Sequence, residues 1–178
     1  MNNLMLQGAT SNCGKSVAVK ALCILLSERG YNVTTFQPDV SFDEHIIRTT
    51  ITRLQRGHDC IILEGIGNPI EWDLTNMKMA NMANAPVILI GDIERGGVFA
   101  GLYGTYALLK EQHRISGFLI NKFRGDEEIL KPGLRFLEER TGKPVVGVIP
   151  YSTKDEFVKT FKESVDWGVM SGILGVNL

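Results

Sequence analysis

The fold is decided near the amino terminus by the stretch Gly8-Ala9-Thr10-Ser11-Asn12-Cys13-Gly14-Lys15-Ser16. The apolar run Leu4–Leu6 precedes this stretch, and an apolar-periodic segment from Val17 to Leu26 follows it. This order predicts a strand, a glycine-bearing loop and a helix. Read from Ala9, the loop matches the phosphate-loop pattern of a small residue, four residues of any type and then Gly-Lys-Ser.

The residue types of this loop suit the phosphate chain of a nucleotide. Small residues allow backbone N–H groups to turn inward around an anion, and a helix that starts at Lys15 adds the positive end of its dipole. Lys15 can reach the terminal phosphates, and the Ser16 hydroxyl can bind Mg²⁺. The alternative is a glycine-rich turn that contains Gly-Lys-Ser by chance. The predicted nucleotide-binding residues of the loop are Thr10, Ser11, Asn12, Cys13, Gly14, Lys15, Ser16 and Val17.

Strand-like and helical runs alternate along the rest of the chain. Runs that are nearly all apolar, such as Cys60–Leu63 and Val87–Ile90, are typical of strands buried on both faces of a parallel sheet. The alternation predicts a doubly wound α/β domain with a mostly parallel sheet, of the phosphate-loop NTPase class. The predicted strands are Asn3–Gln7, Val33–Gln37, Asp59–Glu64, Pro86–Asp92, Ser116–Asn121 and Pro144–Ile149. The predicted helices are Lys15–Arg29, Phe42–Arg56, Leu74–Met82, Val98–His113 and Glu127–Thr141.

A change of pattern near residue 151 divides the chain into two parts. Residues 1–151 are predicted to form the nucleotide-binding domain, and residues 152–178 a carboxyl-terminal tail or linker. Within the tail, Asp155–Val165 has a modest helical pattern, and the apolar residues of Trp167–Val176 are interrupted by glycines. A docking segment, a final strand and the start of a linker all fit this pattern.

Composition narrows the class of protein. The 178 residues, 44% hydrophobic and 22% charged, have the composition of an ordinary globular domain. A net charge of −1 gives no overall attraction for nucleic acid or an anionic membrane. Because the apolar runs are too short for a membrane span and the amino terminus does not resemble a signal peptide, we expect a cytoplasmic location. The three cysteines match no zinc or disulfide spacing.

The residues that follow each strand are candidates for the site, because ligands of open α/β sheets bind at the carboxyl ends of strands. Glu64 ends the third predicted strand and Asp39 follows the second, and both are predicted to join Ser16 as Mg²⁺ ligands. A solvated carboxylate is the alternative for each. Asn121 follows the fifth strand and offers a donor and an acceptor to the edge of a purine. Asp126 lies too far from Asn121 for the usual guanine-reading spacing, which favours ATP.

Longer motifs occur at five places. The most specific are the runs Asp-Ile-x-Arg-Gly-Gly-Val-Phe-Ala and Asn-Lys-Phe-Arg-Gly-Asp. The five stretches are Gly8–Ser16, Glu64–Pro69, Asp92–Ala100, Ile120–Asp126 and Leu137–Val145. Together they resemble the N-terminal synthetase domain of cobyric acid synthase, over residues 1–36 and 58–151. More distantly, the domain is similar to dethiobiotin synthetase and the partitioning ATPases.

This resemblance implies an amide-forming ligase that uses ATP and Mg²⁺ to activate carboxylates of a corrinoid, cobyrinic acid a,c-diamide in its adenosyl form. Phosphoryl transfer would give an acyl phosphate, and ammonia from glutamine would displace the phosphate, a step of cobalamin biosynthesis. By position, Lys15 and Asp92 would be catalytic, with the Asp92–Gly97 loop lining the place where carboxylate and γ-phosphate meet. Asn121 would contact adenine. A separate glutamine amidotransferase and, by analogy, a homodimer are the implied partners.

Three differences from the family leave a second function open. Gln37–Gly57 is a short bridge where the family has a long insert, Gln37 replaces a family lysine, and no amidotransferase half follows in this sequence. A glutamine cannot neutralise the charge that develops on a transferring phosphoryl group. The alternative is an ATP-binding switch module that acts on a partner protein without amidation. A degenerate paralogue that binds ATP weakly is a third interpretation.

Overall fold

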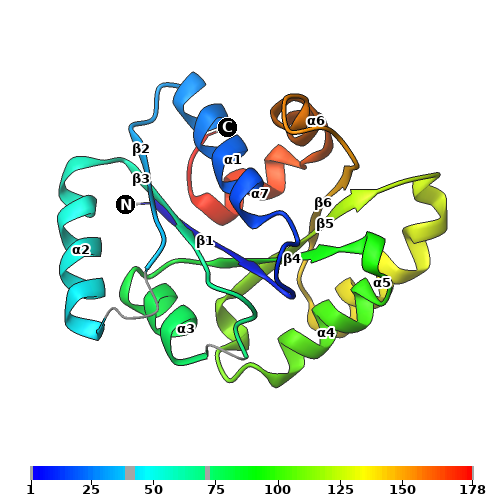
Figure 1. Cartoon of the computed structure of the whole chain (residues 1–178), viewed down its shortest axis with the longest axis horizontal. Coiled ribbons are helices and arrows are strands. Elements are labelled where there is room, and N and C mark those ends of the chain that lie inside the picture. Colours follow the sequence, from blue (N-terminus) through cyan, green and yellow to red (C-terminus); the bar gives the residue numbers. More distant parts are fainter. Residues whose placement is uncertain (1, 39–42, 71–72, 178) are drawn as a thin grey trace.

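The computed structural model describes residues 2–38, 43–70 and 73–177. These residues form a six-stranded sheet in the order β2-β3-β1-β4-β5-β6, in which each strand is parallel to its neighbours (Figure 1). The predicted doubly wound α/β class is confirmed. The strands are β1 (Asn2–Gly8), β2 (Val33–Phe36), β3 (Cys60–Glu64), β4 (Val87–Asp92), β5 (Ile115–Phe123) and β6 (Val145–Pro150).

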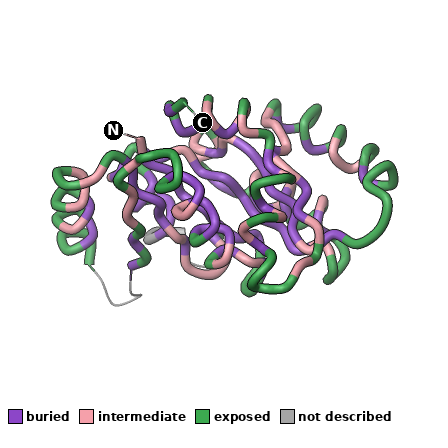
Figure 2. Tube along the Cα trace, turned by 90° about the horizontal axis from the view of Figure 1, so that it is seen from above, coloured by how far each residue is buried: buried purple, intermediate pink, exposed green. Residues whose placement is uncertain are grey.

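Helices cover both faces of the sheet, so the central strands are buried on both sides (Figures 1 and 2). Helices α1, α6 and α7 pack in one core and α2–α5 in the other. None of the described helices is long and apolar enough to cross a membrane. The α-helices are α1 (Lys15–Glu28), α2 (Glu44–Gly57), α3 (Asp73–Met82), α4 (Val98–Leu108), α5 (Lys131–Thr141), α6 (Phe157–Ser164) and α7 (Trp167–Leu174). The 3-10 helices are η1 (Ile93–Arg95), η2 (Gln112–Arg114) and η3 (Glu127–Leu130).

Two predicted helices are divided in the structure. The helix predicted over Val98–His113 ends at Leu108, because Leu109 adopts an extended conformation and buries its side chain in the core. The helix predicted over Glu127–Thr141 begins as η3 and becomes α-helical at Lys131. Pro132 lies in the first turn of α5, where the N–H group that proline lacks has no partner within the helix.

Asp43, one of the acidic residues after β2, has a structural role at the start of α2. The carboxylate of Asp43 accepts a hydrogen bond from the backbone N–H of Ile46 at 2.8 Å. Asp43 is therefore the N-cap of α2, and this bond satisfies one of the unpaired N–H groups of the first turn. Asp39, the predicted metal ligand, lies outside the described residues.

Residues 157–174 form α6 and α7, which share a core with α1. Phe161 is fully buried there, and its ring lies 5.9 Å from that of Phe157 and 6.3 Å from that of Trp167. The end of α6 also reaches the sheet, because Val165 forms an antiparallel bridge with Gly147 of β6. The carboxyl-terminal segment is thus packed against the same sheet as the nucleotide-binding loop.

Replacing Phe161 by alanine should lower the free energy of unfolding by about 3–5 kcal/mol, because it leaves a cavity between α1 and α6. Urea denaturation followed by circular dichroism measures this change. The control is Lys159→Ala, an exposed residue on the same helix, which should change stability by less than about 0.5 kcal/mol. Equal stability of the two variants would contradict the packing of α6 described above.

Candidate functional site

The loop between β1 and α1 curls back over its own start. A Cβ atom on Gly8 would lie 2.6 Å from Cys13 Sγ, 2.7 Å from the carbonyl oxygen of Thr10 and 2.9 Å from Lys15 Nζ. Gly8 is required because any larger residue would collide with this turn. The Lys15 side chain is only 9% exposed, so its ammonium group is held inside the loop.

Asn121, at the end of β5, holds the loop in place. Its Nδ2 donates to the carbonyl oxygen of Cys13 at 2.9 Å, and a side chain at Gly14 would collide with the same Nδ2. Gly14 also has a φ of +98°, which favours glycine. The Oδ1 atom of Asn121 is buried and has no hydrogen-bond partner among the described residues. Asn121 therefore keeps one free acceptor beside the loop.

The phosphate pocket, as we call the cavity at the start of α1, has a volume of about 570 Å³. Lys15, Ser16, Gln37 and Glu64 are among its lining residues. The Ser16 hydroxyl donates to the Glu64 carboxylate at 2.6 Å, although the two residues are 48 positions apart. Six of the predicted loop residues line this pocket, namely Ser11, Asn12, Gly14, Lys15, Ser16 and Val17. Thr10 and Cys13 do not; they shape the loop beneath it.

Ser16 and Glu64 offer the oxygen ligands that Mg²⁺ prefers. Within the described residues, no group of three or more His, Cys, Asp or Glu side chains could hold a metal ion by itself. The two ligands that the described residues offer fit Mg²⁺, which usually keeps waters and binds substrate phosphates as well. Lys15 beside this pair would reach the same phosphates.

Three buried or partly buried amides hold the loop after β3 against the phosphate pocket. Gln7 Nε2 donates to the carbonyl oxygen of Gly67 at 2.7 Å. Asn76 bonds both backbone groups of Ile66, at 2.9 Å to N and 2.7 Å to O. Asn68 Nδ2 donates to the carbonyl oxygen of Ala9. Sequence reasoning missed these residues, although a glutamine in the apolar run of β1 was a usable signal, since buried polar groups need partners.

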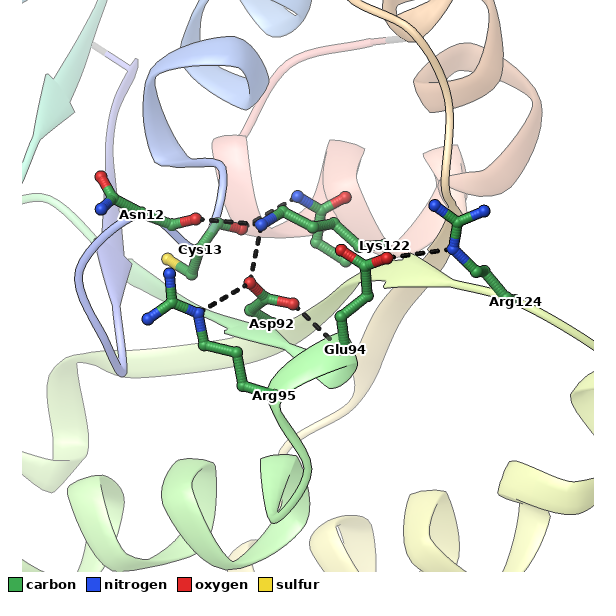
Figure 3. Close-up of polar contacts among 8 residues, drawn as sticks. Asn12, Cys13, Asp92, Glu94, Arg95, Lys122 and Arg124 are labelled. Atoms are coloured by element: carbon green, nitrogen blue, oxygen red, sulfur yellow. Dashed lines mark hydrogen bonds and ion pairs between the residues drawn. The ribbon is translucent and has the colours of Figure 1, made fainter.

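Asp92 lies under the loop rather than in the phosphate pocket (Figure 3). Its side chain is 1% exposed and lies 2.7 Å from Lys122 Nζ and 3.4 Å from Arg95 Nε. Lys122 Nζ also donates to the carbonyl oxygen of Asn12 at 3.2 Å. Asp92 thus holds Lys122, and Lys122 holds the loop.

An unusual backbone conformation lets two successive residues reach the loop. Side chains alternate between the faces of a strand, so Asn121 and Lys122 would point in opposite directions in regular β5. Lys122 has a φ of +63°, which interrupts the alternation. Both side chains therefore contact loop carbonyl groups, at Cys13 and Asn12.

A second cavity of about 290 Å³, the base pocket, lies beside Asn121. Part of its wall is the segment Tyr151–Lys154 after β6, which sequence reasoning did not assign to the site. Arg124 lies over the Tyr151 ring at 3.5 Å from its centroid and pairs with Glu94 at 3.0 Å. This chain of contacts, of which Figure 3 shows the Glu94–Arg124 pair, joins the loop after β4 to the wall of the base pocket.

The cysteine thiols are not suited to nucleophilic chemistry. Burial raises the pKa of Cys13, and nearby Lys15 only partly opposes this effect. Burial also raises the pKa of Cys23 to about 11 and that of Cys60 to about 12. A raised pKa lowers the fraction of thiolate, which is the form of cysteine that reacts or binds metals.

Solved structures of two other proteins share this fold. The cell-division protein MinD of Aquifex aeolicus superposes over 90% of this chain and 87% of its own, with a TM-score of 0.65 at 11% identity. The signal recognition particle receptor FtsY of Elizabethkingia anophelis, in complex with GDP, covers 90% of this chain and 63% of its own, with a TM-score of 0.64 at 14% identity. At these identities the likeness establishes the fold alone, and the dethiobiotin synthetase-like subtype stays a prediction.

Relatives found by sequence have higher identity to this chain than these two solved structures. A probable cobyric acid synthase of Thermococcus kodakarensis is 34% identical over 83% of this chain and 46% of its own length. A cobyric acid synthase of Aliivibrio fischeri is 36% identical over 83% of this chain and 45% of its own. One from Desulforamulus reducens reaches 54% identity over 60% of this chain and 22% of its own.

The chain therefore spans less than half the length of these curated relatives. The first alignment runs over 223 residues, more than this chain contains, so that relative has residues with no counterpart here. The family model of the CobQ/CobB/MinD/ParA nucleotide binding domain matches residues 4–165, which run from within β1 past the end of α6. This match, together with the phosphate loop and its supporting contacts, shows that the chain belongs to the CobQ/CobB/MinD/ParA nucleotide-binding domain family.

Proposed function

We propose that this chain binds ATP with Mg²⁺ and activates a carboxylate of a corrinoid as an acyl phosphate, for amidation in cobalamin biosynthesis. Three relatives with 34–54% identity are named cobyric acid synthase or probable cobyric acid synthase. We also propose a cytoplasmic location, where ATP is supplied. The ammonia for the amide would come from a separate glutamine amidotransferase.

The observation that carries this proposal is the Ser16–Glu64 hydrogen bond of 2.6 Å, beside Lys15 in the phosphate pocket. A hydroxyl at the start of a helix and a carboxylate at the end of a neighbouring strand are the usual Mg²⁺ ligands of phosphate-loop proteins. Bound Mg²⁺ would neutralise charge on the β- and γ-phosphates. In our proposal Ser16 and Glu64 orient the metal, with Asp39 as a further ligand, and Lys15 binds the terminal phosphates.

The free acceptor of Asn121 supports adenine as the base. Because Asn121 Nδ2 is bonded to the Cys13 carbonyl, the group left for a ligand is the unpaired Oδ1. The 6-amino group of adenine donates a hydrogen bond, whereas the corresponding oxygen of guanine only accepts. Oδ1 therefore suits adenine and disfavours guanine.

In the proposed reaction, Asp92 positions the residues around the acceptor site. Its oxygens hold Lys122, Arg95 and the backbone N–H of Glu94 at the start of η1. These contacts fix the loop after β4, next to the phosphate loop, where the acceptor carboxylate would bind. Face-to-face pairing of two copies over the nucleotide is the assembly we propose.

Gln37 favours a second candidate function, an ATPase switch module that acts on a partner protein. Gln37 lines the phosphate pocket, where it adds no positive charge to stabilise a transferring phosphoryl group. Slow hydrolysis that reports nucleotide state to a partner requires less stabilisation of the transition state than fast phosphoryl transfer does. The two functions share Lys15, Ser16 and Glu64 and differ in the acceptor.

Lys15→Ala should abolish detectable ATP binding, because it removes the buried ammonium group of the loop. Isothermal titration calorimetry measures the affinity, and the control is Lys20→Ala, an exposed lysine on α1. Thermal unfolding of both variants verifies that they fold. An unchanged ATP affinity in Lys15→Ala would refute the site.

Glu64→Gln should remove most of the increase in ATP affinity that Mg²⁺ causes in the unmodified chain. The loss expected is about tenfold, the size of one charge-assisted contact. Titrations with ATP, with and without Mg²⁺, measure the effect, and Glu139→Gln on the exposed face of α5 is the matched control. If Mg²⁺ enhances binding equally in both variants, Glu64 has no role in metal binding.

Cobyrinic acid a,c-diamide with ammonium should stimulate the release of ADP from ATP, if a corrinoid carboxylate accepts the phosphoryl group. The comparison is the same reaction without corrinoid, and Lys15→Ala sets the background rate. A rate that the corrinoid does not change would favour the switch module over the ligase.

A further inference from the structure

The phosphate pocket and the base pocket meet at three residues. Gly14 and Val17, at the start of α1, and Lys154, in the loop between β6 and α6, line both cavities. A nucleotide that placed its base in one pocket and its terminal phosphates in the other would pass these residues. The part that lies between base and terminal phosphates is the ribose with the α-phosphate.

The loop that carries Lys154 is held by hydrogen bonds of its neighbouring residues. The loop begins at Tyr151, whose N–H donates to the carbonyl oxygen of Phe123 at 2.8 Å. It ends at α6, where Thr153 Oγ1 donates to the carboxylate of Glu156 at 2.8 Å. Lys154 lies between Thr153 and Glu156, the two partners of the second bond.

The charge of Lys154 is unused in the described structure. Its side chain is exposed and makes no hydrogen bond or ion pair with any described residue. The other lysine of the base pocket, Lys122, is paired with Asp92. Lys15 and Lys154 are the two cationic side chains that line the phosphate pocket, and Lys15 is held inside the loop, away from the base pocket.

Positive charge favours binding along the whole phosphate chain of a nucleotide. Lys15 and a metal at Ser16 and Glu64 would serve the terminal phosphates, and backbone N–H groups at the start of α1 would meet the α-phosphate. A flexible ammonium group at the pocket junction would add a cation there.

We propose that Lys154 is a second phosphate-binding residue, which contacts the α-phosphate of the bound nucleotide. This inference rests on the proposed nucleotide function and extends the site to the loop before α6. Val17 and Lys154 also line a third cavity along α1, with Lys20 and Ile24. Lys154 therefore lies beside the first turns of α1, as a contact to a phosphate at that helix start requires.

The test is calorimetric titration of the full chain with adenosine, AMP, ADP and ATP in the presence of Mg²⁺. Lys154→Met removes the charge and keeps most of the apolar stem. It should lower the affinities for AMP, ADP and ATP by the same factor of about ten, which corresponds to one hydrogen bond to a charged group, and leave the affinity for adenosine unchanged. Lys154→Arg should restore most of the affinity. Lys159→Met, on the exposed face of α6, is the matched control.

The salt dependence of nucleotide affinity distinguishes a lost charge at Lys154 from a change in the structure of the loop. Because Lys154 is exposed, salt should screen its charge; the Debye length is about 10 Å at 0.1 M. The difference in nucleotide affinity between Lys154→Met and the unmodified chain should therefore shrink as NaCl rises from 50 mM to 500 mM. Unchanged affinities in Lys154→Met, or a loss confined to ATP, would overturn the α-phosphate contact and leave the proposed function intact. An unmodified chain that bound none of the nucleotides would overturn both.

Discussion

The hydrogen bond from Asn121 to the Cys13 carbonyl is the contact on which the nucleotide site depends. It joins the end of β5 to a loop that starts two strands away in the sheet, since β4 lies between β1 and β5. The bond is made directly above Gly14, where a side chain would occupy the space of the Asn121 amide. A single glycine thus allows both the left-handed turn of the loop and the close approach of its anchor.

Around this contact, buried charge and buried amides hold the rim of the sheet in one arrangement. Asp92 and Asn121 are opposite each other in the paired strands β4 and β5, so the carboxylate that holds Lys122 lies beside the amide that holds the loop. Gln7 and Asn76 fix the loop after β3 in the same way. Removing one partner of such a buried network leaves another polar group without a partner, which costs about 1–3 kcal/mol. These contacts therefore favour a single arrangement of the loops that line the pockets.

The helices after β6 connect the carboxyl-terminal segment to this site. Phe161 and its neighbours pack on α1, the helix whose amino terminus would receive the phosphates. The loop that leads into α6 contributes Tyr151–Lys154 to the base pocket. The helix that packs against α6 is therefore the same helix whose amino terminus lines the phosphate pocket. The family match extends to residue 165 and so includes α6.

The sequence by itself determined the order of strands and helices as far as β6, the phosphate loop, and the position of Glu64, Asp92 and Asn121 at strand ends. These features follow from local periodicity and from the rule that parallel strands end at one edge of a sheet. Only the tertiary structure decided what each side chain contacts. Asp92 proved to hold Lys122 beneath the loop, and Tyr151–Lys154 proved to line the base pocket. The physical reason is that these contacts join residues 30 or more positions apart, whose meeting depends on strand order, register and one left-handed residue at Lys122, none of which local pattern specifies.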